Sequence, residues 1–390
     1  MKDGLLNRNV DDIIVRSELE KKLKSGHKLR VKHGVDPTNP RYHIGRAVVL
    51  WKLRELQNLG HKIVIIIGDF TATIGDSSDK QAERQPLTAA QVKQNEAKYL
   101  DQIGRVIDIK KAEVHHNSEW FNKMNLADFI HLAEQFTIQQ MIERENFALR
   151  LKAHKPVGLH ETLYPLLQGY DSVAVRSDLE LGGTDQLFNM LAARTVQQLY
   201  KQQSQNVLTT NLLEGTDGRK MSSSWGNCIY LDEAPREMYG QVMTIRDELI
   251  PSYFRLATDL PDVQIVQIER DLAAGDNPRD SKMSLARHIV SRYHGETAAT
   301  EAEAAWIAQF RDKQLPDDIP STDVDKRRPR ILFDIMTDHF GLSKSEARRL
   351  LEQNGVRVDG RVVTDAGFDG YVQGSVVQIG KRRFVKIRLK

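Results

Sequence analysis

The chain has 390 residues, of which 40% are hydrophobic and 28% charged, as in a soluble globular protein with two to four domains. Its single cysteine, Cys228, excludes an intrachain disulfide and a zinc site built from several cysteines. The first residues lack the apolar stretch of a secretory signal. The longest apolar run, residues 63–68, is far below the ~20 residues that a membrane helix needs. We therefore expect a soluble, cytoplasmic protein without membrane contacts.

The net charge of +3 is distributed unevenly along the chain. Residues 326–390 hold fifteen Lys and Arg against seven Asp and Glu, a local balance of +8, and the rest of the chain has a balance of −5. A basic module attached to a mildly acidic body favours a polyanionic partner at the C-terminal end.

The first predicted elements form a β–α–β unit. Segments 28–34 and 62–69 are rich in β-branched residues and contain glycine at or near their ends, as buried parallel strands do. Between them, residues 43–60 place apolar side chains near helical spacing and end at Gly60, which is typical of a helix terminus.

The same alternation continues for another hundred and fifty residues. A long helical run at 118–153 contains no strand signal, which indicates an insertion in the α/β part. The remaining predicted elements are a helix at 88–104 with Thr88 as N-cap, strands at 106–109 and 114–116, a strand at 178–183, a helix at 186–200 and a strand at 206–211. This order predicts an α/β fold with a Rossmann-like, doubly wound parallel sheet that binds ligands at the carboxyl ends of its strands.

The second half of the chain predicts two further structural types. Residues 232–310 contain no convincing strand and show helix-face spacing, whereas 311–330 carry three prolines and many charges. A helix-like stretch and alternating short strands follow to the end of the chain. The expected domains are an α/β domain at 1–225 with its helical insertion at about 118–160, an all-α domain at 226–315, a linker at 316–330 and a small α+β domain at 331–390.

Two segments have the residue types that bind phosphates. In residues 34–47 a strand end leads through a Pro-rich loop to a helix start, where free N–H groups and a partial positive charge suit a triphosphate. His43 there can donate to a phosphate oxygen, and Gly45 allows close approach of a nucleotide. Residues 218–224 form a loop of small residues around Lys220. Taken singly, a histidine at a helix start is more often a cap or a surface group, and the loop on its own is typical of a mobile surface segment.

Together, in this order and about 180 residues apart, the two segments resemble the His-Ile-Gly-His and Lys-Met-Ser-Lys-Ser motifs of class I aminoacyl-tRNA synthetases. The resemblance implies ATP as a substrate, with Mg²⁺ expected, and no metal site built by the protein. It assigns ATP binding to Gly34, Asp36, His43, Gly45, Arg46, Gly183, Asp185, Lys220, Met221, Ser222 and Ser223. It assigns catalysis to Thr38, His43, Lys80, Arg84 and Lys220.

A further group of polar residues indicates which of these synthetases the chain resembles. Tyr164, Gln168 and Asp171 are spaced i, i+4 and i+7 and therefore share one helix face, where buried polar groups need partners. A purely structural network would also explain them. However, segments 164–171 and 179–186 resemble the substrate-binding stretch of tyrosyl-tRNA synthetases, and GVDPT, GDFTATIGDSSDK, HNSEW and NPRD extend the similarity over nearly the whole chain.

The resemblance gives each of these residues a role. Asp171 would accept a hydrogen bond from the substrate phenol, and Tyr164 and Gln168 would hold its ammonium, with Asp76 and Gln186 as further contacts. The tyrosine carboxylate would attack the α-phosphorus of ATP, and tyrosyl would then pass to the 3′-terminal adenosine of tRNA(Tyr). Since the nucleophile is already ionised, the protein must supply positioning and positive charge rather than a general base.

Three positions depart from the usual motifs. Arg46 replaces the second histidine of the first motif, and Ser223 replaces the second lysine of the other. Lys32 stands where a tyrosine often helps to bind the substrate phenol. Our hypothesis is that Arg46 supplies the charge missing at Ser223. The alternative is that position 46 lies on the helix surface and tolerates change.

Residues 331–390 resemble the S-four RNA-binding fold, so that the expected partners are tRNA(Tyr), L-tyrosine and ATP. The resemblance makes residues 1–225 the catalytic domain and 226–315 an anticodon-side domain, and it implies a homodimer with an interface near 118–160. The alternatives are a tryptophanyl-tRNA synthetase, an adenylate-transferring relative and a non-catalytic RNA-binding paralogue. The residues expected to contact tRNA phosphates are Arg348, Arg349, Lys381, Arg382 and Arg383.

Overall fold

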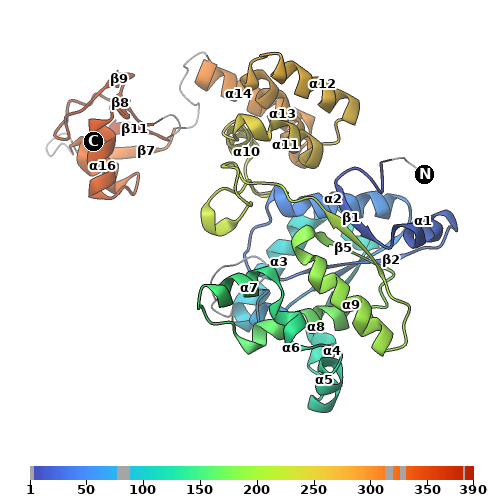
Figure 1. Ribbon diagram of the computed structural model, residues 1–390. Helices are drawn as coiled ribbons and strands as arrows, with labels where there is room; N and C mark the ends of the chain where they lie inside the picture. Colours follow the sequence, from blue (N-terminus) through green and yellow to red (C-terminus); the bar gives the residue numbers. More distant parts are fainter. Residues whose placement is uncertain (1–3, 77–87, 312–318, 326–330, 381–382) are drawn as a thin grey trace. The chain divides into compact units, whose positions relative to one another are not determined.

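The computed structural model describes residues 4–76, 88–311, 319–325, 331–380 and 383–390. It divides into two compact units, Met1–Glu303 and Ala304–Lys390 (Figure 1). Among the described residues, the helices are too short or too polar for any of them to span a membrane.

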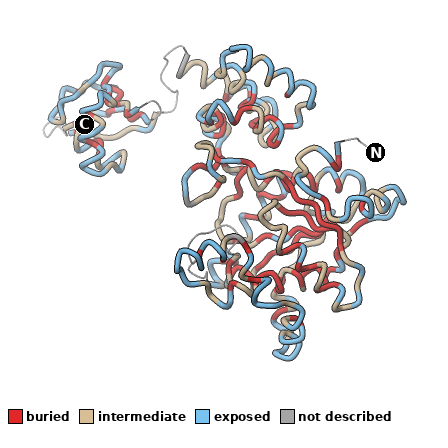
Figure 2. The backbone as a smooth tube through the Cα atoms, in the orientation of Figure 1, coloured by how far each residue is buried: buried red, intermediate tan, exposed pale blue. Residues whose placement is uncertain are grey.

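A six-stranded sheet forms the centre of the first unit. Its strands lie in the order β1-β6-β5-β2-β3-β4, with neighbours parallel except for β1, which pairs antiparallel with β6. The strands are β1 (Val10–Ile14), β2 (Arg30–Val35), β3 (Lys62–Ile67), β4 (Glu113–His116), β5 (Leu179–Gly183) and β6 (Asn206–Thr210). Figure 2 shows these central strands largely in the colour of buried residues. Because β3 is buried between covering helices, its residues 63–67 form an uninterrupted apolar run.

Helices cover both faces of this sheet, as a doubly wound fold requires. Figure 1 shows α2 on one side of the strands and α8 and α9 on the other, and α8 packs along α9. The helices of the α/β part are α1 (Arg16–Lys24), α2 (Ile44–Asn58), α3 (Ala89–Gly104), α8 (Leu159–Ala174) and α9 (Leu187–Leu199). The short helical turns in the first unit are Thr71–Thr73, Ile109–Lys111, Thr184–Gln186, Ser223–Trp225 and Asp247–Leu249.

The strand order reverses between β2 and β5. From β2 the chain proceeds outward to β3 and β4, whereas β5 and β6 lie on the opposite side of β2. The carboxyl ends of β2 and β5 therefore border a crevice, which is where open α/β sheets bind ligands. The predicted fold class is thus confirmed, with the ligand crevice opening beside Val35 and Gly183.

Two local predictions need correction. Residues 106–109, predicted as a strand, form a turn that leads into the short helix Ile109–Lys111, although the side chains of Val106 and Ile107 are buried. Burial alone therefore accounts for their apolar character. Strand β1 was not predicted, because its sequence VDDII carries two central acidic residues that lie exposed on the sheet edge.

The predicted insertion after β4 is helical. It comprises α4 (Ser118–Phe121), α5 (Leu126–Ala133), α6 (Ile138–Ile142) and α7 (Glu145–Lys152). Helix α5 packs against α8, and Figure 1 shows the insertion gathered around that helix.

After the sheet and the loop around Lys220, the described segment 235–311 consists of helices joined by short turns. It contains α10 (Pro235–Val242), α11 (Ile250–Ala257), α12 (Asp262–Ala273), α13 (Pro278–His294) and α14 (Glu296–Trp306), followed by a π-helical turn at Ile307–Arg311. Helix α11 packs on α2, and Trp51 Nε1 of α2 donates to the hydroxyl of Tyr293 on α13 at 3.0 Å. These contacts join the helices to the α/β part in one compact unit, whose limit falls within α14 rather than at the predicted residues 225 and 315.

The second unit is an α+β module around its own sheet, of order β7-β11-β10-β8-β9. Its elements are β7 (Ser321–Val324), α15 (Leu332–Asp338), α16 (Lys344–Glu352), β8 (Val356–Val358), β9 (Arg361–Val362), β10 (Val376–Ile379) and β11 (Arg383–Leu389). Part of the predicted linker 316–330 is therefore a strand, because β7 pairs in parallel with β11 and buries Val324. The short strand was hidden by the prolines and charges around it.

Candidate active site

A cavity of about 440 Å³ opens at the carboxyl ends of β2 and β5. All the residues predicted to bind ATP or tyrosine line it, as does Thr38 among the predicted catalytic residues. They come from the ends of β2 and β5, from the start of α2, from one face of α8 and from the loop around Lys220. Lys80 and Arg84 lie outside the described residues.

The first half of the cavity is formed by the polar face of α8. The hydroxyl of Tyr164 donates to Asp36 Oδ2 at 3.0 Å, and Asp36 Oδ1 accepts from the hydroxyl of Thr71 at 2.9 Å. Burial holds the pKa of Tyr164 well above its usual value, so its phenol stays a donor. About two turns further along α8, Asp171 Oδ1 accepts from Trp120 Nε1 at 2.9 Å. This half therefore offers acceptors that neighbouring donors already orient.

The acidity of Asp171 is set by its burial. Desolvation raises the pKa of this carboxyl to about 7, while the charge of Lys32 and the hydrogen bonds from Trp120 and Asn117 act in the opposite direction. Near neutral pH the carboxylate is thus close to its titration midpoint. When it is ionised, it is a hydrogen-bond acceptor in the lining of the cavity.

A second acidic residue lies beside this face. Asp76 Oδ2 accepts from Gln186 Nε2 at 2.7 Å, and Arg144 Nη2 lies 3.5 Å from Asp76 Oδ1. Arg144 is buried at the junction of α6 and α7, with its guanidinium over the rings of Phe147 and Phe188. The insertion thus supplies a cation that fixes Asp76 next to the cavity.

The second half of the cavity surrounds the first turn of α2. His43 is the N-cap residue, and its Nδ1 accepts from the backbone N–H of Arg46 at 3.3 Å. Burial lowers the pKa of His43 well below its usual value, and the charges of Arg46 and Lys220 act in the same direction. The ring is therefore neutral with its proton on Nε2, which makes Nε2 the donor. That tautomer suits the predicted contact with a phosphate oxygen.

Gly45 and the loop around Lys220 meet at this turn. A Cβ at Gly45 would lie 3.1 Å from His43 Nδ1 and 3.2 Å from Met221 Sδ, so a side chain there would displace one of them. The backbone at this turn is thus accessible to a nucleotide only because residue 45 is glycine.

Arg46 lies in the cavity and not on the outer surface of α2. Its Nη1 donates to the hydroxyl of the buried Tyr99 at 2.7 Å, and its charge acts on His43, Lys220 and Asp185. The alternative places residue 46 on the helix surface and does not fit this position in the cavity lining. That Arg46 supplies the charge missing at Ser223 stays a hypothesis.

Lys220 reaches across to the end of β5. Its Nζ lies 3.0 Å from Asp185 Oδ2. Burial lowers the pKa of Lys220 to about 8, and burial also raises the pKa of Asp185 to about 6. Both groups remain mainly charged at pH 7, so that the lysine is a cation placed against a residue predicted to bind ATP.

The loop that carries Lys220 is tied down by one buried side chain. Asn227 Nδ2 donates to Asp217 Oδ1 at 2.8 Å and to the carbonyl of Lys220 at 3.1 Å, while its Oδ1 accepts from the N–H of Ser222 at 2.9 Å. A single amide therefore sets the shape of the Lys-Met-Ser-Ser-Ser segment.

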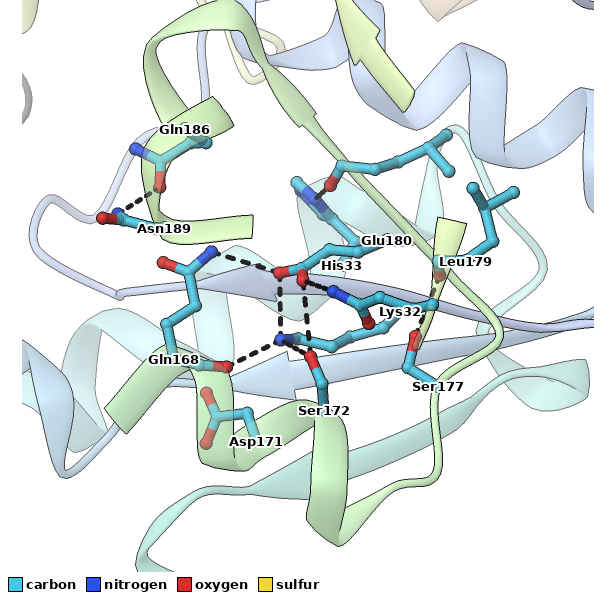
Figure 3. A network of polar contacts seen from close by, with 12 residues as sticks. Lys32, His33, Gln168, Asp171, Ser172, Ser177, Leu179, Glu180, Gln186 and Asn189 are labelled. Carbon is cyan, nitrogen blue, oxygen red and sulfur yellow. Dashed lines mark hydrogen bonds and ion pairs between the residues drawn. The ribbon is translucent and has the colours of Figure 1, made fainter. Parts of the chain in front are cut away.

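Lys32 belongs to a buried network of polar contacts beside the cavity (Figure 3). Its side chain is fully buried, and its Nζ contacts Glu180 Oε1 at 2.9 Å, Ser172 Oγ at 2.6 Å and the carbonyl of Gln168 at 2.9 Å. It is absent from the described cavity lining, whereas Glu180 and Gln168 are part of it. The lysine thus cannot replace a phenol-binding tyrosine directly.

The predicted tRNA contacts lie in the second unit. Arg348 and Arg349 are exposed on α16, and Arg383 is exposed at the start of β11. The charges of Arg349 and Arg383 both act on Glu346, which places these two arginines near one another. Lys381 and Arg382 lie outside the described residues.

Sequence reasoning missed five residues that shape the site: Trp120, Arg144, Glu180, Tyr99 and Asn227. Trp120 belongs to the quoted HNSEW segment and Glu180 to LELGGTDQ, so a motif pointed to both without giving them a role. The other three carry no local signal, because they contact the site only through the fold. Among the described residues, no group of three or more His, Cys, Asp or Glu side chains is arranged to hold a metal ion.

Known families and proteins match this chain over most of its length. Residues 24–311 match the family model of class I tRNA synthetases (W and Y), and residues 339–369 match that of the S4 (S-four) domain. The tyrosine–tRNA ligase of Thermotoga maritima is 46% identical over 387 residues, which cover 98% of this chain and 96% of that protein. That of Bordetella pertussis is 44% identical over 391 residues, covering 99% and 96%.

Solved structures share the fold at lower identity. Tyrosyl-tRNA synthetase from Archaeoglobus fulgidus, complexed with L-tyrosine, has a TM-score of 0.62 at 20% identity and covers 77% of this chain and 98% of its own. Plasmodium falciparum tryptophanyl-tRNA synthetase has a TM-score of 0.56 at 13% identity, covering 74% and 80%. The chain belongs to the class I tRNA synthetase family that contains the tryptophan and tyrosine enzymes. Within that family it belongs with the tyrosine–tRNA ligases, at 44–46% identity over nearly its full length.

Proposed function

We propose that this chain activates L-tyrosine with ATP and transfers the tyrosyl group to the 3′-terminal adenosine of tRNA(Tyr). The observation that carries the proposal is one cavity in which the acceptors of α8 face the cations and N–H groups at the start of α2. Tyrosine would lie along α8 with its carboxylate toward the phosphates of ATP. Membership of the tyrosine–tRNA ligase family supports this reading over a tryptophan enzyme.

In the first step, a tyrosine carboxylate oxygen attacks the α-phosphorus, the bond to the bridging oxygen breaks, and pyrophosphate leaves with the electron pair. The negative charge that develops needs donors fixed in advance. His43 Nε2, Arg46, Lys220 and the N-terminus of α2 would supply them, together with Thr38 and the predicted Lys80 and Arg84. Magnesium would enter bound to the ATP phosphates, and no step requires a metal held by the protein.

Specificity for tyrosine would come from Asp171. A carboxylate aimed at the substrate hydroxyl is left without a partner by phenylalanine, which makes this kind of contact far more selective than apolar packing; tyrosyl-tRNA synthetase is a standard illustration of that rule. Trp120 would keep the carboxylate in place.

In the second step, a ribose hydroxyl of the terminal adenosine attacks the tyrosyl carbonyl, and AMP leaves. The second unit would bind tRNA phosphates through Arg348, Arg349 and Arg383.

In the full chain, R348E/R349E should lower tRNA charging about tenfold and flatten its salt dependence, because fewer counterions are released. Tyrosyl-adenylate formation should not change. Equal charging by this variant and the unmodified chain would contradict the role of α16.

We further propose a homodimer that forms through the insertion and the start of α8. Large apolar side chains that are exposed in the single chain gather there: Leu126, Ile130, Ile138, Leu149, Leu151 and Leu159. A second copy of the chain would cover them. Sedimentation tests this, because the unmodified protein should then sediment as a dimer and the I138D variant as a monomer.

A tRNA-charging protein would work in the cytoplasm, and the single cysteine is compatible with a reducing compartment.

The test of the proposed function is amino-acid-dependent ATP–pyrophosphate exchange with tyrosine, tryptophan and phenylalanine in parallel. Exchange with tyrosine alone is expected. Exchange with tryptophan would support the tryptophanyl alternative, and no exchange with any amino acid would support a non-catalytic RNA-binding paralogue.

A further inference from the structure

The buried ion pair of Lys32 and Glu180 at the cavity wall is fully hydrogen-bonded within the protein. The three contacts of Lys32 Nζ match the three protons of an ammonium. Glu180 accepts from four groups: Lys32 and Gln168 Nε2 at Oε1, and Ser172 and Gln205 at Oε2. Both charges are therefore fully satisfied, and the pair is fixed in one geometry.

One of these contacts involves a residue of the tyrosine pocket. Gln168 Nε2 lies 3.1 Å from Glu180 Oε1 (Figure 3). A carboxylate paired with a lysine can only accept hydrogen bonds, so the Gln168 carboxamide must turn its nitrogen toward Glu180. Its oxygen then lies on the opposite side of the group, as Figure 3 shows. The chemistry of the partner thus fixes the orientation of the amide.

That orientation decides which charge the pocket accepts. Gln168 lines the cavity beside Tyr164 and Asp76. An amide oxygen facing the cavity attracts a substrate ammonium, whereas an amide nitrogen in the same place would repel it. Glu180 has its four hydrogen bonds within the protein and so would act on the substrate through Gln168.

We propose that Lys32 and Glu180 are positioning residues for the substrate amino group, because their ion pair holds the Gln168 carboxamide with Oε1 toward the cavity. This inference rests on the proposed function, since it assigns an amino-acid ammonium to that oxygen. It also explains how a lysine can stand at position 32 without touching the substrate.

The experiment compares two buried carboxylates of the α8 region. In E180Q, the new amide can donate as well as accept, and the Gln168 carboxamide is free to turn. E161Q is the matched control, because Glu161 lies on α8 as Gln168 does and pairs with buried Arg150 of α7 at 2.6 Å, but lies outside the described cavity lining. We expect E180Q to weaken tyrosine binding about tenfold, with the KM for ATP unchanged. E161Q should bind tyrosine normally.

A double-mutant cycle separates positioning from general damage. If Glu180 acts through Gln168, Q168A/E180Q should bind tyrosine no more weakly than Q168A. If E180Q does not fold, K32M/E180M replaces both charges by apolar groups, which proteins often tolerate, and should show the same loss. Normal tyrosine binding by E180Q, or losses that add fully in the double variant, would overturn the inference. Absence of tyrosine-dependent exchange in the unmodified chain would instead overturn the proposed function.

Discussion

The two halves of the cavity are built from opposite kinds of contact. Along α8, acceptors are held by neighbouring donors, as Asp171 is by Trp120 and Asp36 is by Tyr164. Around the start of α2, cations gather instead, and the partner of Lys220 is Asp185, itself a predicted substrate contact. The amino-acid half is thus organised before the substrate arrives, whereas the nucleotide half holds cations that can exchange one anionic partner for another.

Removing the acceptor at the end of the amino-acid half should have the largest effect. In D171N, the negative charge is lost and one of the two acceptor oxygens becomes an NH2 donor, so kcat/KM for tyrosine should fall by about a hundredfold or more. Preference over phenylalanine should fall with it. D101N on the exposed surface of α3 is the control. Full discrimination by D171N would show that another residue recognises the phenol.

The same variant should be more stable at alkaline pH. Burial raises the pKa of Asp171 above its value in the unfolded chain, so the folded state loses stability as pH rises through about 7. Asparagine removes that cost. At pH 8 the Tm of D171N should therefore exceed that of the unmodified chain, and the difference should vanish near pH 4. A lower Tm at pH 8 would mean that Asp171 is held by favourable contacts that outweigh its desolvation.

On the nucleotide side, K220A should slow tyrosyl-adenylate formation by about a hundredfold, because one fixed cation is lost from the phosphates. Binding of tyrosine should be unaffected. K123A, on the exposed insertion, controls for loss of a lysine. The rate is measured in a single turnover by the tyrosine-dependent release of pyrophosphate.

Much of this division could be predicted from the sequence. The strands and the two phosphate motifs are local patterns, and the spacing of Tyr164, Gln168 and Asp171 placed them correctly on one helix face. The partners of the site residues could not be predicted, since Trp120, Glu180 and Tyr99 reach them only through the fold. The contacts are Trp120 with Asp171, Glu180 with Gln168, and Tyr99 with Arg46. Strand β7 was not predicted, because pairing with β11, rather than its own composition, makes this segment a strand.

A smaller effect is expected for Arg46, whose guanidinium Tyr99 holds in the cavity. R46H should slow adenylate formation about tenfold, as one charge-assisted contact is worth roughly 1.5–3 kcal/mol. Adding S223K should restore part of the rate if the two positions supply the same charge. An unchanged rate in R46H would refute the compensation hypothesis.

The smallest effect is a difference in pH dependence between the halves. As pH falls through about 7, Asp171 gains a proton, and kcat/KM for tyrosine should fall a few-fold. For ATP, the profile should follow Lys220, whose pKa is about 8, and Asp185, whose pKa is about 6. The tyrosine profile of D171N should be flat in this range. Identical profiles for both substrates would contradict the division.

The most direct test of that division is calorimetric binding of L-tyrosine, without ATP, to D171N and K220A. The two-part organisation of the cavity predicts that K220A binds tyrosine as tightly as the unmodified chain, while D171N loses about a hundredfold or more in affinity. A comparable loss in K220A, or normal affinity in D171N, would contradict it.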